Sequence, residues 1–250
     1  MGPLEAAAIL LAGVGAGTIN AVVGSGTLLT FPTLLAFGYP AVTANVSNTI
    51  GLVPGSVAGA WGYRRELVGQ RDRVLRLGIG SLLGGAAGGV LLLVLPAGAF
   101  EAIVPALIAL GVLLVLFGPR ISRWVAARHG DGGGEHWWVW PAVFATGVYG
   151  GYFGAAQGVL LMAVLGIGVA DTLQRLNGTK NVLAAIVNAV AGVIFAFVAD
   201  VDWLVVALIA VGSVIGGLIG ASVGRRLRPA VLRGVIVTVG VVALVVLLAR

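Results

Sequence analysis

Cysteine is absent from the 250-residue chain, histidine occurs twice, and only nine residues are Asp or Glu. The lack of cysteine excludes disulfides and thiolate chemistry. Both histidines, His129 and His136, fall in one polar stretch, where we expect them to be solvated. Since metal sites require clusters of cysteine, histidine or carboxylate ligands, we predict no metal and no cofactor. The same scarcity leaves no acid and base facing each other, so we expect the protein not to be an enzyme.

Charge is also scarce. Charged residues make up 10% of the chain, against about 25% in soluble domains, and the mean hydropathy is +1.09. Apolar stretches of about 20 residues recur throughout, which is the length of a helix that crosses a bilayer. We therefore predict an all-α integral membrane protein, embedded in a lipid bilayer, with about eight or more membrane segments. The net charge of +6 sits in loops and predicts orientation, so no nucleic-acid partner is expected.

The chain contains an internal repeat. The glycine-rich stretch 80–88 returns as 212–220, an offset of 132 residues, and the same offset places Gly26 on Gly158 and Asn45 on Asn177. Two repeats in an apolar chain are typical of transporters, whose binding site lies where the repeats meet. The predicted division is a first transmembrane repeat at 1–118, a cytoplasmic linker at 119–138 and a second transmembrane repeat at 139–250.

Ten apolar segments can be delimited, and two of them are too short to cross a membrane. The ten segments are 5–23, 26–38, 43–61, 76–95, 99–118, 139–153, 158–169, 178–199, 203–224 and 231–249. As a helix, 26–38 covers roughly 20 Å of a core about 30 Å thick, and 158–169 is equally short. Glycine-containing breaks precede both, which predicts broken or re-entrant half-helices around a binding site. The alternative is a long kinked helix whose glycines serve close packing.

The loops carry charge asymmetrically. The loop 62–76 is rich in arginine and should be cytoplasmic, whereas its counterpart 200–202 is acidic and should be external. The basic stretches 119–138 and 225–233 should also be cytoplasmic. Corresponding loops then lie on opposite sides, which predicts two inverted repeats and places both termini outside. A parallel eight-helix arrangement is the alternative.

Each repeat carries a polar stripe along one helix face, at positions i, i+3, i+4 and i+11. The stripe consists of Asn45, Asn48, Thr49 and Ser56 in the first repeat and of Asn177, Lys180, Asn181 and Asn188 in the second. Polar side chains that faced lipid would lack hydrogen-bond partners at a cost in free energy, so we expect the stripe to point into the protein. Lys180 is the only lysine, and an intramembrane cation is a candidate functional residue. Its alternatives are an ammonium that reaches the headgroups or one that bonds helix carbonyls.

The inward polar groups are amides, hydroxyls and one ammonium, all of which donate hydrogen bonds to an oxyanion. Exposed N–H groups at the starts of half-helices add partial positive charge. We therefore predict a small oxyanion substrate. The predicted substrate-binding residues are Ser25, Gly26, Thr27, Asn45, Asn48, Gln157, Gly158, Asn177, Lys180 and Asn181.

Two motifs resemble those of a known family. The stretch 20–32, Asn-Ala-Val-Val-Gly-Ser-Gly-Thr-Leu-Leu-Thr-Phe-Pro, and the stretch 176–183, Leu-Asn-Gly-Thr-Lys-Asn-Val-Leu, followed by Asn188, resemble the two half signatures of the TauE/SafE family. Ser25 departs from the third glycine often found there. The resemblance implies a permease for sulfite, sulfonates or related small oxyanions in a bacterial-type cytoplasmic (inner) membrane.

Several alternatives stay open at this stage. An anion channel is the nearest rival, and an intramembrane hydrolase with a hydroxyl activated by Lys180 is a more distant one. The sequence does not decide the anion, the direction of transport, the coupling ion or the oligomeric state, of which a homo-oligomer is one choice.

Overall fold

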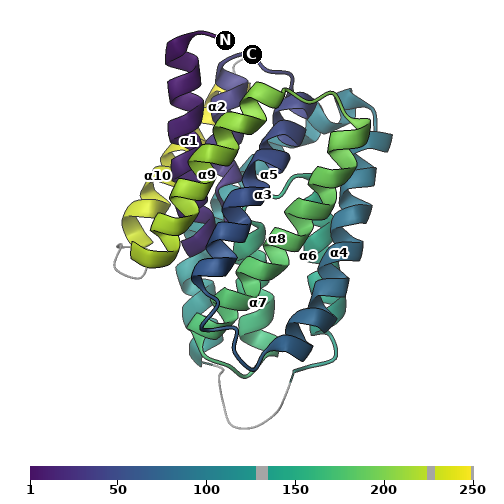
Figure 1. Ribbon diagram of the computed structural model, residues 1–250, viewed down its shortest axis with the longest axis vertical. Coiled ribbons are helices and arrows are strands. Elements are labelled where there is room, and N and C mark those ends of the chain that lie inside the picture. The colour runs from purple at the N-terminus through teal and green to yellow at the C-terminus, as the bar shows by residue number, and fades with distance from the viewer. Residues whose placement is uncertain (128–134, 224–228, 249–250) are drawn as a thin grey trace.

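The structure, a computed structural model, describes residues 1–127, 135–223 and 229–248, which form ten helices (Figure 1). In order these are α1 (Pro3–Val22), α2 (Thr27–Ala36), α3 (Ala41–Gly62), α4 (Arg71–Val94), α5 (Ala97–Ala127), α6 (Val139–Tyr152), α7 (Gln157–Gly168), α8 (Leu173–Val198), α9 (Trp203–Val223) and α10 (Pro229–Leu248). Each of the ten predicted apolar segments is therefore a helix. Helix α5 continues into the predicted linker 119–138 as far as Ala127, and residues 128–134 lie outside the described part.

Helices α1, α4, α5, α8 and α9 contain stretches long and apolar enough to cross a membrane, while α2, α7 and the stretch Ala230–Val245 of α10 are apolar but shorter. Large apolar side chains such as Val94, Phe197 and Val211 are exposed on the long helices. Lipid tails would cover such side chains. The prediction of a helical membrane protein is thereby supported by the outer surface as well as by helix length.

Both short helices belong to hairpins rather than to long kinked helices. The Tyr39 hydroxyl, just after α2, donates a 3.0 Å hydrogen bond to Glu5 at the start of α1, so α2 returns to the end where α1 begins. The His136 N–H, just before α6, donates a 2.9 Å bond to the Gly168 carbonyl, the last residue of α7. Each pair therefore folds back on itself as a hairpin, unlike the single long kinked helix of the alternative. The two hairpins start from opposite ends of the bundle (Figure 1).

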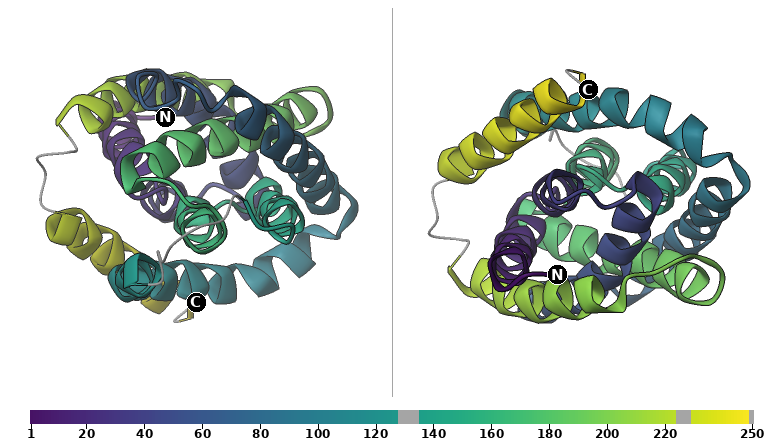
Figure 2. Two further views of the ribbon diagram at one scale, coloured as in Figure 1. Left: turned by 90° about the horizontal axis from the view of Figure 1, so that it is seen from below. Right: turned by 90° about the horizontal axis from the view of Figure 1, so that it is seen from above.

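The two halves of the chain interlock through the glycine rows. Helix α4 packs on α6, and α9 packs on α1 (Figure 2). A Cβ on Gly84 or Gly88 would lie 2.2 or 2.0 Å from a carbonyl oxygen of α6. On Gly216 or Gly220 it would lie 2.0 or 2.7 Å from a carbonyl oxygen of α1. Only glycine permits this backbone approach, so the rows are packing faces.

The two ends of the bundle differ in charge. One end, which we call the arginine end, carries a cluster in which Asp171 pairs with Arg73 at 2.6 Å and with Arg175 at 2.8 Å, and Arg76 pairs with Glu135 at 2.7 Å. Partial burial opposes ionisation of Asp171, but its hydrogen bonds from the two arginines lower the pKa below the ordinary value.

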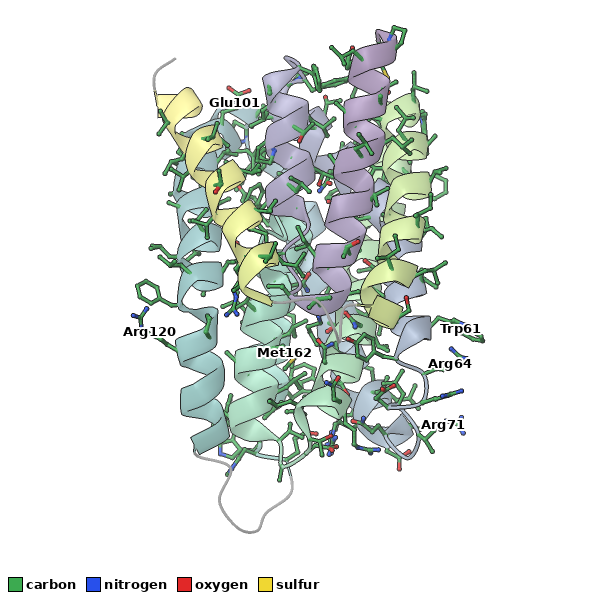
Figure 3. The ribbon with its side chains drawn as sticks, turned by 90° about the vertical axis from the view of Figure 1, so that its left-hand side faces the viewer. Trp61, Arg64, Arg71, Glu101, Arg120 and Met162 are labelled. Carbon is green, nitrogen blue, oxygen red and sulfur yellow. The ribbon has the colours of Figure 1, made fainter. Side chains whose placement is uncertain are left out.

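The opposite end, which we call the acidic end, carries the acids Glu5, Glu101, Asp200 and Asp202. Glu101 lies at this end in Figure 3, well away from Arg64 and Arg71. Here burial and the hydrogen bond to Glu5 raise the pKa of Tyr39 to about 12. The start of α1 and the end of α10 also lie at the acidic end (Figure 1).

Candidate functional site

The breaks of the two hairpins touch each other inside the bundle. The Gly158 N–H, in the first turn of α7, donates a 2.9 Å hydrogen bond to the Gly24 carbonyl, between α1 and α2. A Cβ on Gly24 would lie 2.3 Å from the Gly158 Cα, and the φ of Gly24 is +83°. Close approach and positive φ both require glycine here. The point where the half-helices end is therefore shared by both halves of the chain.

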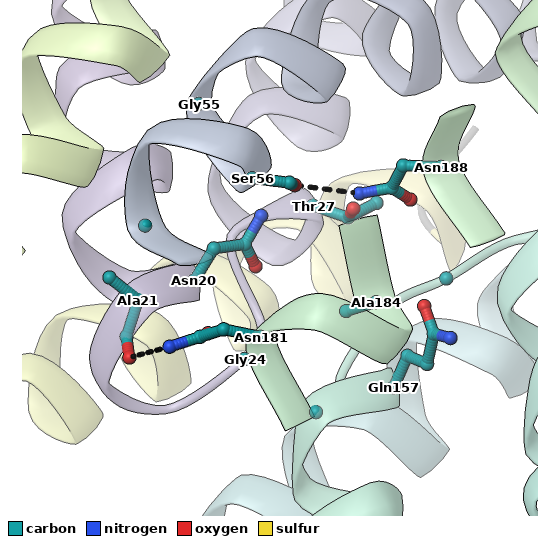
Figure 4. A pocket seen from close by; sticks show the side chains of 13 residues that line it. Asn20, Ala21, Gly24, Thr27, Gly55, Ser56, Gln157, Asn181, Ala184 and Asn188 are labelled. Carbon is teal, nitrogen blue, oxygen red and sulfur yellow. Dashed lines mark hydrogen bonds between the residues drawn. The ribbon is translucent and has the colours of Figure 1, made fainter. Parts of the chain in front are cut away.

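A small polar cavity of about 20 Å³ lies at this crossing (Figure 4). Helices α1, α3, α7 and α8, the start of α2 and both breaks contribute to its wall. The lining residues are Asn20, Ala21, Gly24, Thr27, Gly55, Ser56, Gly59, Gly154, Gln157, Gly158, Asn181, Ala184 and Asn188. The wall thus combines amides and hydroxyls with glycines, and it contains no carboxylate and no ammonium.

Gln157 is a buried polar side chain of this wall with an unsatisfied donor among the described residues. It is the first residue of α7 and is 4% exposed, yet its Nε2 has no hydrogen-bond partner among the described residues. A Cβ on Gly150 would lie 2.4 to 2.6 Å from the atoms of this amide, so the absence of a side chain at Gly150 makes the space for it. A buried donor without a partner is costly and is satisfied by a bound ligand or water.

The other polar side chains of the cavity are engaged with the protein. Asn20 accepts a 2.7 Å bond from the Gly26 N–H and so holds the start of α2. Asn188 Nδ2 donates to Ser56 Oγ at 3.0 Å, as drawn in Figure 4. These two residues occupy matched places in the two repeats, so the polar stripes of α3 and α8 face each other. Asn181 Nδ2 donates to the Ala21 carbonyl at 3.3 Å.

Lys180 is completely buried, and its ammonium lies on the end of α1. The Nζ donates to the Asn20 and Ala21 carbonyls at 3.1 and 3.4 Å, and Asn177 Nδ2 reaches the Ala21 carbonyl at 3.3 Å. The headgroup alternative is therefore excluded, and the carbonyl-bonding alternative describes the contact. The last carbonyls of a helix carry partial negative charge, which a cation offsets.

The structure divides the predicted site residues into two groups. Four of them line the cavity, namely Thr27, Gln157, Gly158 and Asn181. Six do not, namely Ser25, Gly26, Asn45, Asn48, Asn177 and Lys180. Most of the second group hold helix ends. Asn48, for example, bonds the hydroxyls of Thr27 and Thr30 on α2. Whether any of the ten binds a substrate stays a prediction.

Three polar cavity residues were not in the predicted site. Ser56 and Asn188 belong to the recognised stripes, so the inward-facing pattern already pointed to them. Asn20 had a weaker signal, a lone amide shortly before a glycine break. The offset also needs correction at the breaks, because Gly24 and Gly154 both have positive φ and both follow a half-helix. They lie 130 positions apart, so Gly26 and Gly158 are not structural counterparts.

A multi-pass helical membrane protein in which two half-helix breaks meet at a polar cavity has the architecture of a secondary transporter. The family described as Sulfite exporter TauE/SafE matches residues 9–247, and the chain belongs to this family. The chain is 24% identical to the Probable membrane transporter protein YfcA of Escherichia coli strain K12, over 96% of this chain and 88% of that protein.

Two other relatives are also named as probable membrane transporters. The chain is 26% identical to the Probable membrane transporter protein ORF9 of Sinorhizobium sp, over 94% of this chain and 88% of that protein. It is 25% identical to a Probable membrane transporter protein of Haemophilus influenzae, over 86% and 84%. No solved structure matches the chain. The protein is therefore a membrane transporter of the TauE/SafE family.

Proposed function

We propose that the protein carries a small oxyanion of the sulfite or sulfonate type and binds it in the cavity between the two hairpins. The observation that carries this proposal is the Nε2 of Gln157, a buried donor at the start of α7 that has no hydrogen-bond partner in the described part of the chain. The dipole of α7 adds partial positive charge at its start, although the first N–H groups of this helix already bond the Gly154, Gly24 and Ala156 carbonyls. The cavity wall has no carboxylate that would repel an anion.

The proposed binding residues are Thr27, Gln157, Gly158 and Asn181 together with Asn20 and Asn188. Lys180 acts through α1, because its ammonium is bound to the carbonyls of that helix. This contact also argues against an intramembrane hydrolase, since the ammonium contacts carbonyls rather than a serine or threonine hydroxyl. The family description, which names sulfite export, supports a sulfur oxyanion as substrate.

We further propose that the two halves are inverted repeats in a cytoplasmic (inner) membrane. The hairpins α1–α2 and α6–α7 start from opposite ends of the bundle, and α4 meets α6 as α9 meets α1. Two half-helix hairpins and six further helices then make up the membrane part. The arginine end is cytoplasmic by the positive-inside rule. Rocking one half against the other would open the shared cavity to each side in turn.

The first experiment is a binding and flux comparison of Gln157→Leu with the wild type. Purified protein is titrated with sulfite, sulfate, sulfoacetate, thiosulfate, a carboxylate and simple cations while Tm is followed, since a ligand that binds the folded state raises Tm. We expect a sulfur oxyanion to raise the wild-type Tm and to bind Gln157→Leu about 10 to 100 times more weakly, the worth of one hydrogen bond to a charged group.

The matched control is Gln70→Leu, which removes another buried glutamine amide, outside the cavity wall. This variant should lose stability through its bonds to Glu66, Arg175 and Thr179 while keeping the wild-type affinity for the anion. Unchanged anion affinity in Gln157→Leu, or stabilisation by cations alone, would overturn the proposal. Saturable, slow flux in liposomes would separate a carrier from an anion channel.

A further inference from the structure

Helices α1 and α6 both end inside the bundle, and they have the same type of C-terminus. The Ile19 carbonyl accepts the N–H groups of Val23 and Gly24 at the end of α1, at 2.7 and 2.9 Å. The Tyr149 carbonyl accepts those of Phe153 and Gly154 at the end of α6, at 3.0 and 3.1 Å. Each end leaves carbonyl oxygens that point out of the helix and carry partial negative charge.

The two ends are neutralised differently. The end of α1 receives the Lys180 ammonium together with amide donors from the stripe of α8. The residue matched to Lys180 in the first repeat is Asn48, whose amide is engaged with α2. Among the described residues, the side-chain bond to the last turn of α6 comes from Asn45, whose Nδ2 donates to the Tyr152 carbonyl at 3.0 Å. No lysine or arginine of the described part bonds these carbonyls.

Asn45 also presents an unused oxygen at this place. Its side chain is completely buried, and its Oδ1 has no hydrogen-bond partner among the described residues. The amide cannot be turned around, because the Tyr152 carbonyl needs a donor and so fixes Nδ2 on that side. A buried acceptor therefore belongs to the same amide whose Nδ2 contacts the end of α6, whereas the corresponding end of α1 receives an ammonium.

We propose that a small monovalent cation, tested as Na⁺, binds between Asn45 Oδ1 and the last carbonyls of α6 and takes the place that Lys180 Nζ takes on α1. Amide and carbonyl oxygens without a carboxylate suit a monovalent ion better than Ca²⁺ or Mg²⁺, whose sites use carboxylates. Carbonyls at half-helix ends bind such ions in transporters. Coupling of this ion to anion transport rests on the proposed function, whereas the cation site itself does not.

The test is the Tm of the purified protein in NaCl, KCl and choline chloride at equal ionic strength, with no oxyanion present. A bound cation at ten times its Kd should raise Tm by about 3 to 6 °C for a chain of this size. We expect this shift in NaCl for the wild type and its loss in Asn45→Ala. The matched control is Asn177→Ala, which removes the equivalent amide at the end of α1. It should keep the sodium shift.

A second variant keeps the cation site testable if Asn45→Ala does not fold. Asn45→Asp keeps an oxygen and adds a negative charge beside the carbonyls, so its sodium shift should exceed that of the wild type. Equal Tm of the wild type in all three salts, or a sodium shift that survives in Asn45→Ala, would refute the cation site. A sodium shift without any sulfite binding would keep the cation site and refute the proposed anion function, so the two failures are distinguishable.

Discussion

At the scale of single residues, Lys180 shows how a buried charge can serve a site without lining it. Its ammonium is held by two carbonyls of α1, whose last residues form one wall of the cavity. The lysine therefore positions Asn20 and Ala21, and through Asn20 it also positions the start of α2. A residue of this kind affects the geometry of the site and the stability of the fold together.

The variant Lys180→Met keeps most of the side-chain volume and removes the ammonium. We expect a loss of about 1 to 3 kcal/mol in the free energy of unfolding, because carbonyls at the helix end lose a charged donor. The measurement is Tm without any anion. The affinity for sulfite should fall less than in Gln157→Leu. A variant with wild-type Tm that no longer binds the anion would show instead that Lys180 contacts the substrate directly.

At the scale of helices, the glycine rows decide how closely the two halves approach. Gly216 on α9 faces the backbone of α1, and a Cβ there would lie 2.0 Å from the Val14 carbonyl and 2.8 Å from the Thr18 nitrogen. Both neighbours are backbone atoms of a long helix, so they cannot move away singly. Packing of α9 on α1 also supports the helix end that Lys180 neutralises, which links this interface to the cavity.

Gly216→Ala should lower the free energy of unfolding by about 1 to 3 kcal/mol through overpacking. Gly234→Ala is the matched control, because Gly234 also lies within a helix, α10, but has open space where its Cβ would stand. Alanine there should leave stability unchanged or raise it by about 0.5 to 1 kcal/mol. The measurement is thermal unfolding of both variants. Equal changes in stability would mean that the close approach of α1 and α9 is not required.

At the scale of the whole molecule, the arginine end and the acidic end predict its orientation. The natural absence of cysteine allows single cysteines to be labelled without background. Val68→Cys, exposed in the α3–α4 loop, and Asp200→Cys, in the α8–α9 loop, mark the two ends. A membrane-impermeant maleimide applied to intact cells should label Asp200→Cys and not Val68→Cys. The reverse pattern would invert the orientation, and labelling of both would contradict the assignment of opposite sides.

The positions of the helices and breaks depend on short stretches of the chain, so they can be predicted from the sequence. Hydropathy and glycine spacing depend on a few consecutive residues, and they predict all ten helices, both breaks and the inward stripes of α3 and α8. The motifs at 20–32 and 176–183 indicate the family for the same reason. Charge along the loops predicts the difference between the two ends of the bundle, since it depends only on which loop holds each residue.

Only the tertiary structure decided what each polar side chain touches. Lys180 and Gln157 are both inward-facing donors near a break. Lys180 is bound to the end of α1, whereas Gln157 Nε2 has no partner among the residues that the structure describes. The difference arises from the packing of α1 and α6 against the opposite half, which brings together residues more than 100 positions apart. The same packing places Asn45 on Tyr152 and joins Asn188 to Ser56. Contacts of this range depend on the arrangement of whole helices, and no local pattern in the chain encodes them.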